Sequence, residues 1–411
     1  MTVNGENRSA SLALKFFIFF YFSTIGLFLP YLPLLFRSNG LSDWQVGILF
    51  SIGPLVTIAI QPMWGFISDR FKTVKKMIIL QLAVTVVLSF FVFRITRFDL
   101  LLPALFVFNV FAFPIIPLMD SLTLASVRNT KGHYGAFRLW GSLGFALSAL
   151  LFGLFFRYRD LDLFPLCYSA LLMVCLFLSF FLIDAVYVGK RAGLRDVGQL
   201  ISNKSVITFL LLTALLSSTN RANDAFLGIF IKQLGGQADT VGYAWTVAAL
   251  SEVPVLALGG VLLARFSELK LLAAAALVFS ARWALFHIVS DPAAVIFIQL
   301  THSLSFGLFF LCSVSYMSKL VPDCLRSSGQ GLLAAFLGGI AGIAGSTLGG
   351  AVMSGLGPKT LYLICSATAL AAFFFYLYRY RSENGEKCCA EKEQSRPAGD
   401  WNPESRSQKP E

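Results

Sequence analysis

The feature that most constrains this chain is a series of long apolar runs, each of which can cross a lipid bilayer as a helix. A membrane-spanning helix needs about 20 predominantly apolar residues, whereas a membrane β-barrel uses strands of about ten residues with alternating polarity. The runs of this 411-residue chain are long, and short polar loops separate them. We therefore expect an all-α membrane protein with twelve transmembrane helices, at approximately 14–36, 44–67, 75–95, 100–126, 138–156, 163–184, 205–231, 241–264, 271–290, 292–318, 327–354 and 358–379.

Composition and charge support a protein embedded in lipid. Hydrophobic residues make up 56% of the chain and charged residues 13%, about half the charged share of an ordinary soluble domain. The net charge of +11 is dispersed over short loops, without the basic patch that nucleic acid would require. Lys and Arg are more frequent at the N-terminus, in the even-numbered loops and in the tail than in the odd-numbered loops. This bias predicts a multi-pass protein of the cell membrane with both termini in the cytoplasm.

The longest polar connection inside the helical body follows the sixth run and divides the chain into two equal sets of helices. Two equal sets indicate two pseudo-symmetric six-helix bundles. A short echo supports this duplication, since "GFISDRF" and "GVLLARF" each end the second run of their half. We expect an N-terminal bundle at 1–184, a cytoplasmic linker at 185–204, a C-terminal bundle at 205–380 and a disordered cytoplasmic tail at 381–411.

A few charged residues fall inside the apolar runs rather than in loops. Each unpaired charge costs roughly 3 kcal/mol or more at the centre of a bilayer, so such residues usually pair or face a polar cavity. Arg221 also has a structural interpretation, because its position allows it to extend to the membrane surface. Asp224 lies three residues after it and could simply neutralise that arginine. The residues are Asp120, Arg138, Arg221, Asp224, Glu252 and Arg282.

His302 lies in the apolar stretch "IQLTHSLSFG", with Gln299 and Ser305 on roughly the same helical face. A single helical histidine is often a hydrogen-bonded packing residue. It is also the side chain that changes charge most readily near neutral pH, so a proton-carrying role is equally open. The seven cysteines form no C-x-x-C pair, and we expect neither a bound metal nor a cofactor.

The stretch "GFISDRFKTVKK" resembles the signature that the major facilitator superfamily carries between its second and third helices, G-x-x-x-D-R/K-x-G-R-K. Gly65, Asp69 and Arg70 match it, and two lysines follow. The resemblance implies a gating loop. The inner glycine of the signature is absent here, and Ala264 replaces the acid in the second half, so the two halves need not gate symmetrically.

Four further stretches narrow the resemblance to the phenylpropionate-type branch of that superfamily, which is grouped with lactose permease and the proton-coupled nucleoside transporters. They are "FNVFAFPIIPLMDSLT", "YGAFRLWGSLGF", "VGYAWTVAALSEVP" and "IQLTHSLSFG". In the lactose permease pattern, Asp120 matches a sugar-binding carboxylate of the fourth helix. Arg138 matches the arginine partner of that carboxylate, so we expect these two side chains to pair when the site is empty.

The second half matches the same pattern with informative departures. Glu252 and Asp224 match acids of the eighth and seventh helices. Ser305 replaces the proton-carrying glutamate of lactose permease, Gln299 replaces its lysine, and Phe145 replaces its sugar-stacking tryptophan. These departures argue against lactose as a substrate. The resemblance implies substrate contacts by Asp120, Arg138, Phe145, Glu252 and His302, and proton coupling by Asp224, Glu252, Arg282 and His302.

The resemblance implies a monomeric secondary active transporter that works by alternating access. Its substrate would be a small organic solute such as an aromatic acid, a nucleoside or a sugar-like molecule, moved together with protons. A proton-coupled drug exporter is the alternative within transport, and a non-transporting membrane sensor is an alternative of another class. The sequence has no nucleophile elbow, no H-E-x-x-H motif and no phosphate-binding lysine, so we do not expect an enzyme.

Overall fold

A computed structural model describes residues 3–129, 134–184, 198 and 200–394. Within these residues the chain is helical and contains no strand. The first half consists of α1 (Val3–Ser38), α2 (Asp43–Ala59), α3 (Gln61–Arg70), α4 (Lys75–Val92), α5 (Phe98–Ala112), α6 (Ile115–Asn129), α7 (Tyr134–Tyr158) and α8 (Phe164–Ser179). The second half consists of α10 (Lys204–Gln233), α11 (Ala238–Arg265), α12 (Glu268–Ile288), α13 (Pro292–Ile298), α14 (Leu308–Leu320), α15 (Arg326–Ala334) and α16 (Ala341–Gln394).

The described helices match the predicted membrane spans, although several are bent. Nine are long and apolar enough to cross a membrane, and up to eleven if each of two bent pairs counts as one span. The first pair, α2 and α3, bends by 42° close to Pro62. The second bend, of 52°, divides α11 just after Pro254. Proline removes a backbone donor and crowds the preceding turn, which accounts for both bends.

The last apolar segment, Ser328–Glu383, covers the two spans predicted at 327–354 and 358–379. Gly357 interrupts it with φ +80°, a left-handed conformation that glycine adopts without steric cost. Pro358 follows and begins the next helical segment. Dividing the segment at Gly357 gives the predicted spans, but the total of twelve remains a prediction.

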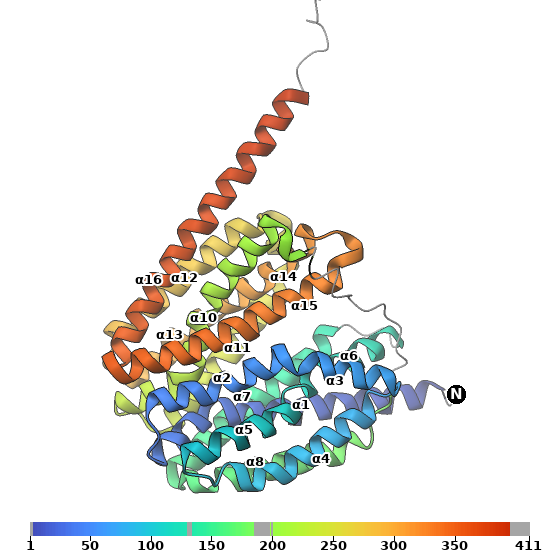
Figure 1. Ribbon diagram of the computed structural model, residues 1–411, viewed down its shortest axis with the longest axis vertical. Helices are drawn as coiled ribbons and strands as arrows, with labels where there is room; N and C mark the ends of the chain where they lie inside the picture. Colours follow the sequence, from blue (N-terminus) through green and yellow to red (C-terminus); the bar gives the residue numbers. More distant parts are fainter. Residues whose placement is uncertain (1–2, 130–133, 185–197, 199, 395–411) are drawn as a thin grey trace, which may run out of the picture.

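The two halves lie one above the other in Figure 1, with the first half (blue to teal) below and the second half (green to red) above. Contacts between them involve mainly α7 with α11, α2 with α16 and α1 with α10. The α7–α11 contacts and the first contacts of α2 lie at the end of the molecule that contains the turn between α1 and α2, far from the N-terminus. We call this the closed end. Helix α2 also contacts the second half farther along, where Ile58 lies beside Gly339.

Beyond residue 380, where the C-terminal bundle was predicted to end, α16 continues as a helix to Gln394. Glu383 accepts a hydrogen bond from the Tyr316 hydroxyl and lies 3.7 Å from the Arg379 guanidinium. These contacts tie the start of the extension to the bundle. The following Glu, Lys and Ala residues have high helix propensity and allow the helix to continue. The remaining tail, 395–411, and linker residues 185–197 and 199 lie outside the described residues.

Candidate functional site

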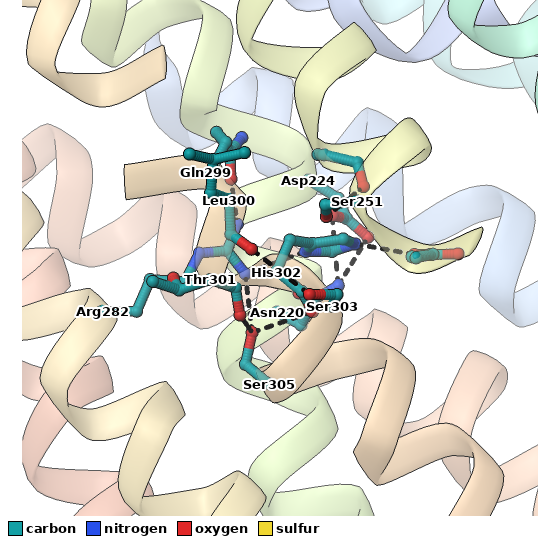
Figure 2. A network of polar contacts seen from close by, with 12 residues as sticks. Asn220, Asp224, Ser251, Arg282, Gln299, Leu300, Thr301, His302, Ser303 and Ser305 are labelled. Carbon is teal, nitrogen blue, oxygen red and sulfur yellow. Dashed lines mark hydrogen bonds and ion pairs between the residues drawn. The ribbon is translucent and has the colours of Figure 1, made fainter. Parts of the chain in front are cut away.

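Arg282 lies at the centre of a polar network inside the second half. Its side chain comes from α12 and is 1% exposed. One terminal nitrogen, Nη1, lies 2.9 Å from His302 Nδ1 and donates to Ser305 Oγ at 3.3 Å, while Nη2 donates to Gln299 Oε1. Figure 2 shows these four side chains directed toward one another. Among the described residues no carboxylate forms an ion pair with Arg282, so neutral acceptors surround this buried cation.

His302 connects Arg282 to Glu252 of α11. Its Nε2 lies 2.9 Å from Glu252 Oε1. A guanidinium can only donate hydrogen bonds, so Nδ1 must accept from Arg282, and the ring proton must be on Nε2. His302 therefore donates to the Glu252 carboxylate as a neutral imidazole. The Glu252 side chain is 24% exposed and the His302 side chain 10%. Glu252 is therefore the most accessible member of the series of contacts that runs from Arg282 through His302.

Asp224 forms a second cluster on α10. It accepts hydrogen bonds from Asn220 Nδ2 at 3.2 and 3.3 Å, and Arg221 Nη1 lies 3.3 Å from its Oδ2. Asp224 therefore neutralises Arg221, as their spacing of three residues on one helix allowed. Arg221 also donates from Nε to the carbonyl oxygen of Leu337 at 3.4 Å, which joins α10 to the α15–α16 region.

Backbone irregularities occur beside both clusters. Ser303–Gly307 and Ala335–Ile340 are π-helical, and the bend of α11 follows Glu252 by a few residues. A π-helical turn shifts side chains around the helix axis and leaves some carbonyl groups without helical partners, and it is often found at functional sites. Leu337 lies in the second π segment, and its carbonyl accepts from Ser217 Oγ as well as from Arg221.

Among the contacts of the described residues, Asp120 and Arg138 do not form the predicted pair. Arg138 is an exposed residue of α7 whose guanidinium lies 4.6 Å from the centroid of the Phe22 ring. No ion pair between these two residues is present among the described contacts. The guanidinium instead binds an aromatic face of α1, an interaction that is favourable for a partly hydrated cation. Asp120, on α6, is partly exposed.

Helices α7 and α11 form the first of two seams that join the halves at the closed end. Arg157 Nη1 lies 2.6 Å from Asp239 Oδ2. One turn farther into the molecule, Gly153 and Gly242 are in contact, since a Cβ added to either would lie 3.1 Å from the Cα of the other. The absence of side chains at these glycines lets the two backbones approach.

The second seam joins α2 to α16. The Trp44 backbone N–H donates to Ser354 Oγ at 2.7 Å. A Cβ added to Gly47 would lie 2.4 Å from the carbonyl oxygen of Ser346. Both seams therefore combine small residues with polar contacts, and both hold the halves together at the closed end.

Phe145, a predicted substrate contact, lies on the α7–α11 seam. Its ring meets Trp245 of α11 with centroids 5.8 Å apart and ring planes at 61°. Trp245 is 6% exposed, and its indole nitrogen has no hydrogen-bond acceptor among the described residues. Trp245 could not be recognised from the sequence, because an aromatic residue on an apolar helix gives no signal of which half it will touch.

Of the predicted gating residues, Gly65 lies in the middle of α3, while Asp69 and Arg70 end this helix before the connection to α4. Asp184, which the sequence analysis also missed, holds this connection. Its carboxylate accepts from the backbone nitrogens of Val74 at 2.8 Å and Lys75 at 3.0 Å. A carboxylate at a helix N-terminus satisfies donors that the helix leaves free and interacts favourably with its dipole.

The chain is similar to known membrane proteins along most of its length. The model of the MFS_1 like family matches residues 11–364. The chain is 28% identical to the maltose permease of Geobacillus stearothermophilus, over 90% of this chain and 95% of that protein. It is 25% identical to the probable 3-phenylpropionic acid transporter of Escherichia coli (strain K12), over 75% of this chain and 81% of the relative. The crystal structure of the nucleoside transporter NupG aligns with a TM-score of 0.81 at 17% identity, covering 90% of this chain and 98% of that one.

Proposed function

The chain belongs to the MFS_1-like family of the major facilitator superfamily, and from that premise we propose that it carries a small organic solute across the cell membrane together with a proton. Membership makes it a multi-pass transporter with the major facilitator fold rather than an enzyme. The solute class and the coupling to protons are our proposals. The relatives named above carry maltose and 3-phenylpropionic acid by their names, and the fold is shared with a nucleoside transporter.

The observation that carries the proton proposal is the contact between Arg282 Nη1 and His302 Nδ1, which requires Nδ1 to accept. A second ring proton would have to bind Nδ1, where Arg282 already donates from 2.9 Å. Two donors would then face each other, and the contact would break. The group that accepts an incoming proton is therefore Glu252, which is the more exposed of the two partners. His302 acts as a positioning residue between the buried guanidinium and this carboxylate.

Protonation of Glu252 also changes the charge balance of the second half. With both acids ionised, Asp224 and Glu252 balance Arg221 and Arg282. A neutral Glu252 leaves one cation in excess, in a region where an uncompensated charge is costly. A solute that brings a carboxylate restores the balance, so proton and anion binding favour each other. Among the three solute classes, this reasoning favours an aromatic or other organic acid.

The arrangement of the halves suggests which side of the membrane exchanges solute in this structure. With both termini in the cytoplasm, as the distribution of Lys and Arg predicts, the closed end faces outward. Arg138, Glu252 and the gating loop then lie toward the cytoplasm. We assign the structure to the state that exchanges solute with the cytoplasm, and the seams to the gate that opens on the other side.

The test is accumulation of labelled 3-phenylpropionate, uridine and maltose by proteoliposomes under an acid-outside pH gradient. We expect uphill uptake of at least one probe that an uncoupler abolishes. In Glu252→Gln, uphill uptake should fall to the equilibrium level while solute exchange across the membrane persists, because a neutral amide cannot release a proton.

The matched control is Asp99→Asn, which neutralises an acid in an exposed pair with Arg97 and should leave accumulation unchanged. Uncoupler-sensitive accumulation that survives in Glu252→Gln contradicts the role of Glu252. Extrusion of all three probes, rather than uptake, would favour the proton-coupled exporter instead.

A further inference from the structure

The indole N–H of Trp245 is an exception among the buried indoles of this chain. Trp64, which is 7% exposed, donates to the carbonyl oxygen of Val110 at 2.9 Å, and the fully buried Trp283 donates to Thr219 Oγ1 at 3.0 Å. Trp245 is equally buried but has no acceptor within the described part of the chain. A buried donor without a partner is destabilising, and most such donors in native proteins are paired. The exception indicates that the acceptor comes from a molecule other than this chain.

Trp245 lies where the two halves of the molecule meet. Its ring touches Phe145 across the boundary between the halves. The adjacent residue, Thr246, donates from Oγ1 to the carbonyl oxygen of Ala146 at 3.0 Å, which places Trp245 on the α7–α11 seam. Alternating access requires this seam to part, and parting it exposes both rings and the indole N–H to the space between the halves.

Helical spacing places the charged groups of the proposed site beside this ring pair. Glu252 follows Trp245 by seven residues on α11, and Arg138 precedes Phe145 by seven residues on α7. Seven residues are nearly two helical turns, so each charged group shares a helical face with its ring at a distance of about 10 Å along the axis. Because the two helices are antiparallel along their seam, Arg138 and Glu252 both lie on the side of the rings that faces away from the closed end.

We propose that Trp245 is a specificity-determining residue that donates a hydrogen bond from Nε1 to an acceptor on a planar ring of the solute, while Phe145 contacts that ring from the other half. This inference rests on the proposed transport function and refines the solute class. The solute is an elongated molecule with a ring nitrogen or carbonyl oxygen at one end. Its other end carries the polar or anionic group that Arg138 and the Glu252 network receive.

The test compares the binding of matched probes to purified protein by isothermal titration calorimetry. The probes are 3-(4-pyridyl)propionate and 3-(3-pyridyl)propionate, which carry a ring acceptor, 3-phenylpropionate, which lacks one, and uridine, which has ring carbonyls. Trp245→Phe keeps an aromatic ring and removes the donor. We expect it to weaken binding of the best acceptor-bearing probe by about 3- to 10-fold, the range that one hydrogen bond contributes. Binding of 3-phenylpropionate should change less than about twofold.

The matched control is Trp64→Phe, the same substitution at an equally buried indole whose N–H already has an internal acceptor. It should not alter the preference among probes, even if it lowers stability. The proposal is overturned if Trp245→Phe weakens all bound probes equally, since Trp245 then contributes packing alone, or if it changes none of them. The proposed function fails in a different way, when the unmodified protein binds and transports none of the probes.

Discussion

At the scale of single residues, the gating loop contains one backbone conformation that its sequence does not favour. Lys72 has φ +52° and is the only non-glycine residue with positive φ in the described part of the chain. It occupies the position where the superfamily signature has its inner glycine. A residue with a side chain pays about 1–2 kcal/mol for this left-handed conformation. The Asp184 contacts to Val74 and Lys75 hold the loop in place despite this cost.

The conformation of Lys72 predicts opposite results for two substitutions. Lys72→Gly should preserve or raise the apparent melting temperature in detergent, because the gain at positive φ offsets the extra freedom of glycine in the unfolded chain. Lys72→Val should melt about 2–4 °C below Lys72→Gly, since a β-branched residue is least tolerant of this region. The control is Lys76→Gly, in the helical first turn of α4, where glycine should destabilise. A lower melting temperature for Lys72→Gly than for Lys72→Val would contradict the backbone argument.

At the scale of secondary-structure elements, the α7–α11 seam depends on two glycines. A Cβ at Gly242 would lie 2.5 Å from the carbonyl oxygen of Ala149 and 2.7 Å from the Tyr31 hydroxyl. Because one of these atoms belongs to the backbone, α7 or α11 must move to accept a side chain. Gly260, on the same helix, has nothing within 4 Å of an added Cβ. Comparing substitutions at Gly242 and Gly260 therefore distinguishes an effect on the seam from the general effect of replacing a helical glycine.

Gly242→Val should force the halves apart at the closed end and favour the opposite state. The readout is a cysteine placed at Ser346, which is 4% exposed on the other seam. A membrane-impermeant maleimide added from outside should label this cysteine several-fold faster in Gly242→Val than in the parent, because both seams must open together. Gly260→Val should leave the labelling rate unchanged. Equal rates in all three backgrounds would mean that the glycine contact does not hold the halves together.

The sequence predicted where the helices lie better than it predicted which helices contact one another. Apolar run length located the helices because burial in lipid requires each span to satisfy its own backbone hydrogen bonds. The resemblance assigned both Arg282 and His302 to proton coupling, and the structure brings their side chains into contact. Three features depend on which helices are neighbours in the folded protein. They are the contact of Arg138 with Phe22, the helix cap by Asp184 and the Trp245 indole N–H without an internal acceptor. Neighbouring helices here are far apart in sequence, and a pattern along one helix does not specify its partner.

At the scale of the whole molecule, the two halves behave as bodies that meet at one end. The α7–α11 and α2–α16 seams lie on the same end of the bundle, and each joins a helix of the first half to a helix of the second. Polar contacts at the seams, such as the pair between Arg157 and Asp239, can exchange with water when the halves separate. Small residues between them let the two backbones approach closely. This construction suits a gate that opens and closes repeatedly.

If transport requires this gate to open, a covalent link across it must stop transport. Cysteines at positions 157 and 239 replace an ion pair whose atoms lie 2.6 Å apart, so a short flexible bis-maleimide can join them. We expect the cross-linked Arg157→Cys, Asp239→Cys variant to lose solute uptake, because the link keeps the α7–α11 seam closed. Each single-cysteine variant treated with the same reagent should retain uptake, which controls for the lost ion pair. Continued uptake after cross-linking would show that the seam does not open during transport.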